Sequence, residues 1–249
     1  MDRALYIAMS GAKQNTLGQT AEANNLANVS TTGFRRDFEH ARSMPVFGDH
    51  YPTRAYAMEE RPASDFNPGT LVHTGRDLDI AIDNQGWIAV QDANGNEAYT
   101  RRGDLNVDQF GRLVNGEGLQ LIGNAGPLVI PPYEKLEIAS DGTISIQALG
   151  DDPAVIADVE RLKLVLPDQS QLEKGEDGLF RMRGQQPGDI QPLDPTVKVE
   201  SGHLEHSNVN AVQSLTQIMS LQRQYELQVK MMKTADENAQ TTQQIMEIQ

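Results

Sequence analysis

Positions near the carboxyl end of the chain alternate spacings of three and four residues. They are Ile218, Leu221, Tyr225, Gln228, Met232, Ala235, Ala239, Thr242 and Met246. This heptad spacing predicts one long amphipathic helix, on the order of 60 Å for about 40 residues, with Ser207 or Asn208 capping its start. Further apolar residues widen the stripe, so more than one neighbouring helix is expected. They are Val212, Leu215, Met219 and Val229.

The amino end repeats the pattern more weakly. Its stripe runs through Leu5, Met9, Ala12, Thr16, Gln19, Ala23 and Leu26. A second helix over residues 3–28, about 39 Å long, is therefore predicted. Asn24, Asn25 and Asn28 crowd its final turn, where short amides compete with the helical backbone, and Gly33 soon follows. The helix is expected to stop near Asn28.

Between these ends the periodicity changes to two, which is typical of strands. The segments are LDIAI (78–82), WIAVQ (87–91), KLEIA (135–139), TISIQ (143–147), RLKLVL (161–166) and the TVKV run (196–199). Three dipeptides that tolerate positive φ predict tight hairpin turns: Asn94-Gly95, Asp141-Gly142 and Asp177-Gly178. The middle of the chain is therefore predicted to be an antiparallel β domain.

These patterns divide the chain into four parts. Residues 1–36 hold the first helix and its turn, residues 37–72 a proline-containing extended connector without sustained periodicity, residues 73–200 the β domain, and residues 201–249 the second helix. The predicted fold class is α+β, with the terminal helices forming a coiled-coil layer and an antiparallel all-β domain between them. The terminal stripes would be unpaired unless they meet each other or other subunits, which indicates an assembly protein.

Composition excludes several classes of protein. The chain has 249 residues, no cysteine, and 35 acidic against 21 basic side chains, a net charge of −14. Nucleic acid is therefore a poor candidate partner, and disulfides and thiolate chemistry are excluded. No window approaches the roughly 18 consecutive apolar residues of a membrane span, so membrane insertion is not expected. Polar residues interrupt the amino-terminal apolar run early, so a cleaved signal peptide is not expected either.

The candidate ligand-binding motifs do not match the spacing of known metal or cofactor sites. Asp92, Asn94 and Asn96 imitate the start of a calcium loop, but Glu97 replaces its glycine and Gly103 its final glutamate, so a hairpin turn is predicted instead. His203 and His206 stand three apart without a third ligand at metal-binding spacing. The glycines of residues 116–121 lack the third glycine of a dinucleotide fingerprint. We therefore expect no metal, no cofactor, no catalytic residue and no enzymatic activity.

Two separated segments resemble the signatures of one family. EANNLANVSTTGFRRD (22–37) resembles the amino-terminal signature of the axial proteins of the bacterial flagellum, and GHLEHSNVN (202–210) resembles the motif before their carboxy-terminal helix. Residues 73–114 are similar to the β domain shared by rod and hook proteins, and residues 1–12 and 161–181 extend the likeness. One departure is Thr32, where relatives usually carry proline, and it affects only the stiffness of that turn.

The resemblance implies a structural subunit of the basal-body rod, the drive shaft that crosses the periplasm and transmits torque from motor to hook. It points to a proximal rod subunit, and the distal rod protein is the alternative within the family. Implied partners are other proximal and distal rod subunits, copies of this chain, and the flagellar type III export apparatus, which handles such subunits without a cleaved signal. The terminal helices are expected to form the inner layer.

The resemblance and the helical stripes together assign assembly to one set of residues. They are Leu5, Met9, Ala12, Asn24, Asn25, Leu26, Asn28, Gly33, Phe34, Gly202, Leu204, Glu205, Ser207, Asn208, Val209, Asn210, Leu215, Ile218, Leu221, Tyr225 and Met232. Each has a plainer interpretation. The asparagines alone favour simple helix termination, and Gly33 with Phe34 a turn with a buried ring.

Two other classes of function remain open. A secreted β-rich adhesin with helical oligomerisation ends would not need paired signatures at both ends. An acidic carbohydrate hydrolase would need two carboxylates in one groove, for which Asp77 with Asp79 and Glu59 with Glu60 are the candidates. It would also need aromatic sugar platforms, which the 6 tyrosines, 6 phenylalanines and single tryptophan make doubtful.

Overall fold

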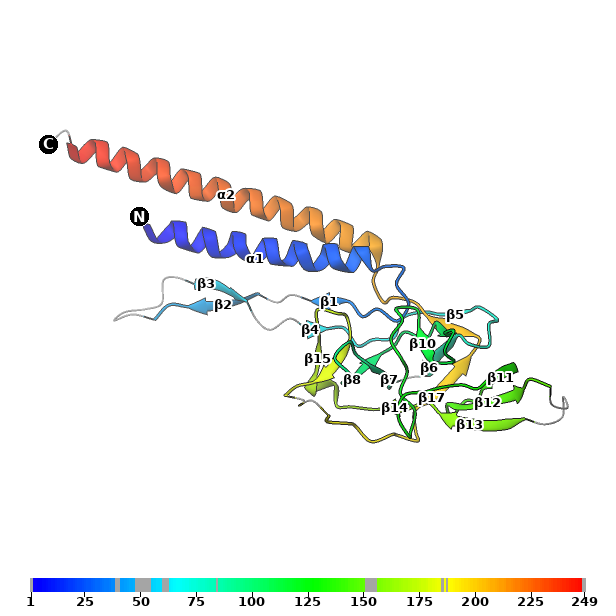
Figure 1. Cartoon of the computed structure of the whole chain (residues 1–249). Helices are drawn as coiled ribbons and strands as arrows, with labels where there is room; N and C mark the ends of the chain where they lie inside the picture. The colour runs from blue at the N-terminus through cyan, green and yellow to red at the C-terminus, as the bar shows by residue number, and fades with distance from the viewer. Residues whose placement is uncertain are drawn as a thin grey trace. The chain divides into compact units, whose positions relative to one another are not determined.

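The computed structural model describes residues 2–38, 41–47, 55–59, 63–83, 85–150, 156–184, 186 and 188–247. The chain forms two compact units (Figure 1). Unit 1 comprises Met1–Val29, Arg36–Asp65 and Val209–Gln249, and unit 2 comprises Ser30–Arg35 and Phe66–Asn208. The backbone therefore passes between the units four times. Residues 39–40, 48–54 and 60–62 of the predicted connector lie outside the described residues.

Two helices dominate unit 1, and both confirm the terminal periodicity. Helix α1 spans Asp2–Ala27 and helix α2 spans Ala211–Glu247. They run side by side in opposite directions (Figure 1). Helix α1 ends one residue before Asn28, as its asparagine-rich last turn predicts. None of the helices in the described ranges is long and apolar enough to cross a membrane.

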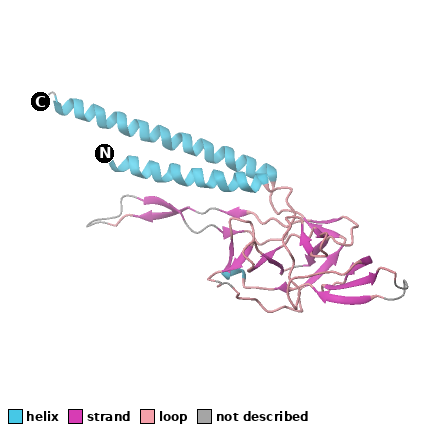
Figure 2. Ribbon diagram, viewed as in Figure 1, coloured by secondary structure: helices cyan, strands magenta, loops and turns pink. Residues whose placement is uncertain are grey.

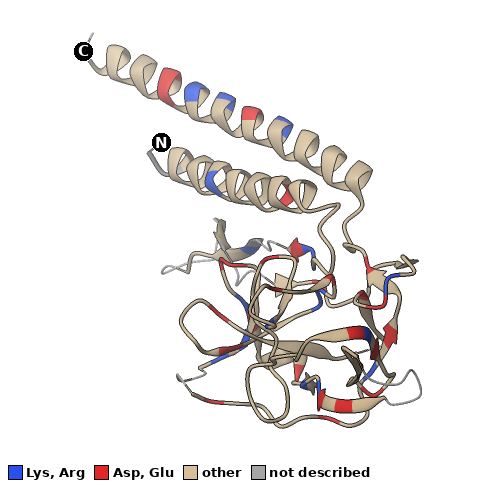
Figure 3. Cartoon of the chain, turned by 45° about the vertical axis from the view of Figure 1, so that its right-hand side comes forward, with Lys and Arg blue, Asp and Glu red and all other residues tan. Residues whose placement is uncertain are grey.

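The start of α2 corrects the predicted cap. Asn210, and neither Ser207 nor Asn208, caps the helix: its Oδ1 accepts hydrogen bonds from the amides of Val212 at 3.1 Å and Gln213 at 3.2 Å. The side chain of Asn208 is instead bonded within unit 2, where its Nδ2 donates to the Asn67 carbonyl. The first turns of α2 are uncharged (Figure 3), and residues 211–222 contain no charged residue.

Small residues of α1 face α2. A side chain at Gly11 would lie 2.9 Å from Gln228 Nε2, and one at Gly18 would lie 3.2 Å from Leu221 Cδ1. The predicted stripe of α1 is only partly confirmed, because its member Ala12 is buried but its member Met9 is 52% exposed. Ala8, which the predicted stripe did not include, is buried instead. The close approach of the helices requires small residues at the contact, so the larger methionine lies outside it.

On α2 the predicted seam is largely confirmed. Ile218, Leu221 and Met232 are half-buried, whereas Leu215 is exposed. In this antiparallel pair Gly11 lies against Gln228 and Gly18 against Leu221. By the same register, the first residue of α1, Asp2, lies opposite residue 237. Residues 238–247 of α2 therefore continue past the amino-terminal end of α1 (Figure 1).

Short strands that the sequence did not predict lie in the connector range. In unit 1, β1 (Asp37–Phe38) pairs with β4 (Ala63–Ser64), and β2 (Ala41–Pro45) pairs with β3 (Ala55–Glu59), which contacts α1. Prolines and mixed polar residues conceal this pairing, since the strands are too short for a period of two to be visible.

Unit 2 consists of short antiparallel strands joined by loops (Figure 2). In chain order they are β5 (Leu71–His73), β6 (Ile80–Asp83), β7 (Trp87–Gln91), β8 (Glu97–Thr100), β9 (Leu105–Val107), β10 (Leu113–Asn115), β11 (Tyr133–Ile138), β12 (Thr143–Ala148), β13 (Ala157–Arg161), β14 (Leu164–Val165), β15 (Leu172–Lys174), β16 (Phe180–Met182), β17 (Lys198–Ser201) and β18 (His203–Glu205), with a 3₁₀ turn at Gln169–Gln171. The largest sheet has the order β14-β7-β8-β16-β15, and a second has the order β11-β12-β13. In separate pairs, β6 joins β17, β5 joins β18 and β9 joins β10.

The six predicted strands are present, with one division. The run at residues 161–166 splits between β13, which pairs with β12, and β14, which pairs with β7. All three predicted hairpin turns are confirmed, and their glycines have positive φ, for example 85° at Gly142. The main core contains Ile80, Ile88, Leu121, Ile144 and Leu162, each fully buried.

A smaller aromatic cluster surrounds the single tryptophan. Trp87 is 4.4 Å from the ring of Phe180 and 6.0 Å from that of Phe66 between centroids. Trp87 is itself 3% exposed. Its fluorescence therefore reports the state of unit 2.

Asp92, in the β7–β8 turn, is expected to make the stability of unit 2 sensitive to acid. Burial raises the pKa of Asp92, but hydrogen bonds from Asn96, Arg181 and Asn94 outweigh it, so the pKa lies below its ordinary value of 3.8. A carboxyl with a lowered folded pKa stabilises the fold above its ordinary pKa, and that stability is lost as pH falls through the folded pKa. We expect Asp92→Asn to reduce the loss of unit 2 stability between pH 6 and pH 3 in urea titrations followed by Trp87 fluorescence. An unchanged pH dependence would contradict this assignment.

Candidate functional site

The two signature segments meet in unit 2. The Gly33 amide donates to the Glu205 carbonyl at 2.7 Å, and the Asn208 amide donates to the Phe34 carbonyl at 3.4 Å. A third segment, residues 67–69, joins them. We call residues 33–35, 67–69 and 205–208, together with Arg101, the signature junction.

A buried ion triad lies at the centre of the signature junction. Arg35 Nη2 is 2.7 Å from Glu205 Oε1, and Arg101 Nη1 is 3.1 Å from Glu205 Oε2. The three side chains are 0%, 4% and 1% exposed for Arg35, Arg101 and Glu205. Burial lowers the pKa of Arg101 to about 10, with Glu205 opposing and Arg35 reinforcing the shift. The single Glu205 carboxylate thus faces two guanidinium groups.

The third segment is bound by the same groups. Arg35 Nη1 donates to the Asn67 carbonyl at 2.8 Å, and Asn208 Nδ2 donates to that carbonyl at 3.0 Å. The Gly69 amide donates to Glu205 Oε1 at 2.8 Å. The signature junction thus ties together the three segments at which the backbone leaves or enters unit 2.

Gly33 is required by two constraints. Its φ is 69°, and a side chain there would lie 2.4 Å from the backbone carbon of Arg101. The neighbouring Phe34 ring is half-buried rather than buried as predicted. Lys174 Nζ lies 3.8 Å from its centroid and donates to the Arg35 carbonyl at 2.9 Å. The Lys174 ammonium therefore lies over the Phe34 ring.

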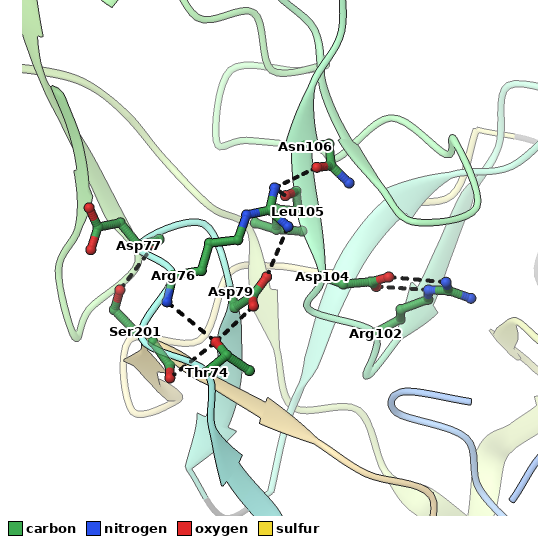
Figure 4. Close-up of polar contacts among 10 residues, drawn as sticks. Thr74, Arg76, Asp77, Asp79, Arg102, Asp104, Leu105, Asn106 and Ser201 are labelled. Atoms are coloured by element: carbon green, nitrogen blue, oxygen red, sulfur yellow. Dashed lines mark hydrogen bonds and ion pairs between the residues drawn. The ribbon is translucent and has the colours of Figure 1, made fainter. Parts of the chain in front are cut away.

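Polar contacts hold the turn at Gly202, and Figure 4 shows those that link Thr74, Arg76 and Asp79. The Gly202 amide donates to the Asp79 carbonyl at 2.7 Å, and its carbonyl accepts from the Thr74 amide at 2.8 Å. The Asp79 carboxylate accepts from Thr74 Oγ1 at 2.7 Å and from Arg76 Nη1 at 3.3 Å. Asp79 therefore has a structural role, which removes support for pairing it with Asp77 as a hydrolytic site.

In unit 1, Asn25 binds the backbone of Asp37, the last residue of the first signature. Its Nδ2 donates to the Asp37 carbonyl at 2.9 Å, and its Oδ1 accepts from the Asp37 amide at 2.9 Å. The Asp37 carboxylate accepts from Ser64 Oγ at 2.9 Å, and Arg36 pairs with Glu22 at 2.5 Å. Asn25 is fully buried, so its amide serves as a two-point partner for the backbone of β1.

The other asparagines of the signature differ in role. Asn28 Nδ2 donates to the Asn24 carbonyl at 2.9 Å, which agrees with simple helix termination. In the second signature, Ser207 and Val209 are buried, while Leu204 lies in β18 opposite Val72. Leu5 and Leu26 of α1 are half-buried, and Tyr225 of α2 is 39% exposed.

Several junction residues were not predicted. Arg35 stands inside the first signature, but a single arginine in a mixed segment carries no periodic signal. Arg101 and Asn67 lie far from either signature in sequence and become partners only through folding. A cation buried by tertiary contacts has no local pattern that would reveal it.

The rejected ligand sites have structural explanations. Asp92 Oδ1 accepts from the amides of Asn94 and Asn96 in a hairpin turn. The rings of His203 and His73 contact each other, with 4.8 Å between their centroids and an angle of 51° between their planes. Within the described ranges, no group of three or more histidine or acidic side chains is arranged to hold a metal ion.

Comparisons with known proteins match the same segments. Family models describe residues 5–35 as "Flagella basal body rod protein", residues 81–146 as "Flagellar hook protein FlgE/F/G D1 domain" and residues 200–245 as "Flagellar basal body rod FlgEFG protein C-terminal". The first and last of these ranges supply the segments that meet in the signature junction.

Whole-chain relatives agree. The chain is 41% identical over 249 residues to the flagellar basal-body rod protein FlgF of Escherichia coli (strain K12), covering 99% of each chain. It is 33% identical over 247 residues to FlgF of Caulobacter vibrioides, covering 95% of each. It is 31% identical over 268 residues to the rod protein FlgG of Buchnera aphidicola subsp. Schizaphis graminum, covering 97% of this chain and 99% of that protein.

Gly33→Ala tests the close packing of the signature junction. We expect it to destabilise unit 2 far more than Gly118→Ala, which has a similar φ of 83° but open space around it. The positive φ alone costs roughly 1–2 kcal/mol, and at Gly33 the backbone must also move away from Arg101. Urea unfolding followed by Trp87 fluorescence measures both variants. Equal losses would show that the close approach is unimportant.

Asn25→Asp tests the clamp in unit 1. The variant removes the amide donor and places a carboxylate against the Asp37 carbonyl beside Glu22, so we expect a loss of about 1–3 kcal/mol in the stability of unit 1. Asn24→Asp, on the exposed side of the same turn, is the matched control and should lose much less. Helical circular dichroism in urea provides the measurement, and similar curves for the two variants would refute the clamp.

Proposed function

Because the chain belongs to the family of flagellar basal-body rod proteins that includes FlgF, and is a structural subunit of that rod, we propose that its terminal helices form the inner, coiled-coil layer of the assembly. The supporting observation is the uncharged start of α2. Val212 is 72% exposed, Leu215 51% and Met219 60%. Apolar side chains on a helix face without charges favour burial against other subunits.

The far end of α2 supports the same proposal. Ile245 and Met246 are 62% and 70% exposed in the segment that continues past α1. A helix that extends beyond its intramolecular neighbour leaves its seam open to a helix from another subunit. Copies of this chain and other proximal and distal rod subunits are the proposed occupants.

A rod of such subunits grows by a heterologous contact repeated with rotation and rise. The surface that carries one subunit onto the next is therefore not self-complementary, and growth stays open. We place the protein in the periplasm-spanning rod and in the proximal part of it. The higher identity to the FlgF relatives than to the FlgG relative supports proximal over distal placement.

Torque transmission is the proposed mechanical role. Twisting must be resisted by continuous helices and close packing rather than by loops. Helix α2 supplies 37 residues of uninterrupted helix without proline or glycine. Delivery by the flagellar type III export apparatus, without a cleaved signal, is part of the proposal and rests on family membership.

Leu215→Ser tests helix-mediated assembly. Complementing a deletion strain with this variant should reduce swimming and the yield of the protein in isolated basal bodies, because burial of one leucine contributes about 1.5–3 kcal/mol. The thermal midpoint of the purified monomer should not change, since Leu215 is already exposed there.

Gln217→Ser, at an exposed polar position on the same helix, is the matched control and should retain motility. Normal swimming with Leu215→Ser would refute the docking role of this face. A deletion strain that still assembles complete rods would refute the proposed function itself.

A further inference from the structure

The last segment of unit 2 closes sheets that begin much earlier in the chain. Strand β17 pairs with β6, with Val199 opposite Ile82 and Ser201 opposite Ile80. Strand β18 pairs with β5, with Leu204 opposite Val72. Residues 198–205 are therefore the final partners of strands located over 100 residues before them.

The same segment supplies the negative charge of the ion triad. Arg35 and Arg101 both precede Glu205 in the sequence, and in the folded chain each is buried in contact with that carboxylate. Burying a guanidinium away from an acidic partner is strongly unfavourable. Two buried cations in one site would also repel each other at low dielectric.

Arg101 connects the triad to the centre of unit 2. Its Nη1 donates to the Ile82 carbonyl in β6 at 3.3 Å, and its guanidinium carbon is 5.6 Å from the Trp87 ring centroid in β7. The Arg101 charge that Glu205 balances thus lies against the core strands β6 and β7. Loss of the Glu205 carboxylate is therefore expected to affect β6 and also β7, which contains Trp87.

We propose that Glu205 makes closure of unit 2 conditional on arrival of the carboxy-terminal signature. Until residues 198–208 dock, Arg35 and Arg101 cannot be buried together, and the preceding strands stay open. Unit 2 therefore closes in one late step during synthesis or stepwise passage of the chain. The second signature thus acts as a folding latch in addition to leading into α2.

Refolding of the full chain tests the order of events. In pulse-labelling hydrogen exchange, the amides of β7 and β8 should gain protection in the same kinetic phase as those of β17 and β18. Strands β7 and β8 pair with each other and not with β17 or β18, so this timing is not a consequence of shared hydrogen bonds. Protection of β7 and β8 in an earlier phase would overturn the proposal.

Charge variants test the cause. Glu205→Gln keeps the shape and an oxygen for the Gly69 amide, yet we expect it to raise the open fraction of unit 2 on the order of 100- to 1,000-fold. Exchange should rise across β6, β7 and β8, and Trp87 emission should shift to longer wavelength. Glu200→Gln, an exposed position on β17, is the matched control and should leave both unchanged.

A neutral triad separates charge from shape. The variant Arg35→Met, Arg101→Met, Glu205→Gln contains no ions at the site, so it should recover most of the exchange protection lost in Glu205→Gln alone. Failure of this variant to recover protection would show that buried charge is not what makes closure conditional. Exchange limited to β5 and β18 in Glu205→Gln would likewise overturn the proposal.

Discussion

One carboxylate buried between two guanidiniums organises unit 2. Glu205 contacts Arg35 and Arg101, and it also accepts the amide of Gly69. A buried charge is tolerated only when its partners are fixed in place. The positions of three segments distant in sequence therefore depend on one another, and the tight backbone approach at Gly33 follows from that dependence.

The helices of unit 1 follow a different physical rule. Helix α1 presents small residues to α2, and its larger Met9 remains outside the contact. The close contact between the two helices therefore buries little of the apolar surface of α2. Helix α2 thus pairs within the chain and still carries the exposed apolar residues that the proposed assembly requires.

Periodicity predicted the long elements, because a helix or a strand repeated over many residues leaves a regular trace in the sequence. The three hairpin turns were predictable for a local reason, the tolerance of positive φ at Gly95, Gly142 and Gly178. The cap at Asn210 was not predicted because other polar residues that could cap the helix precede it. Only the folded structure shows that the side chain of one of them, Asn208, is bonded elsewhere. The ion triad was unpredictable, since Arg101 joins it solely through the folding of β6 and β7.

The backbone segments between the units are anchored on both sides. In unit 2 the signature junction binds residues 33–35, 67–69 and 205–208 to one another. In unit 1 Asn25 binds Asp37, and Ser64 binds the carboxylate of that residue, while Asn210 caps α2. Of the four crossings between the units, those at residues 35–36, 65–66 and 208–209 therefore have hydrogen-bonded residues on both sides. Because hydrogen-bonded ends leave little slack in these connections, they are suited to the torque transmission proposed for this rod subunit.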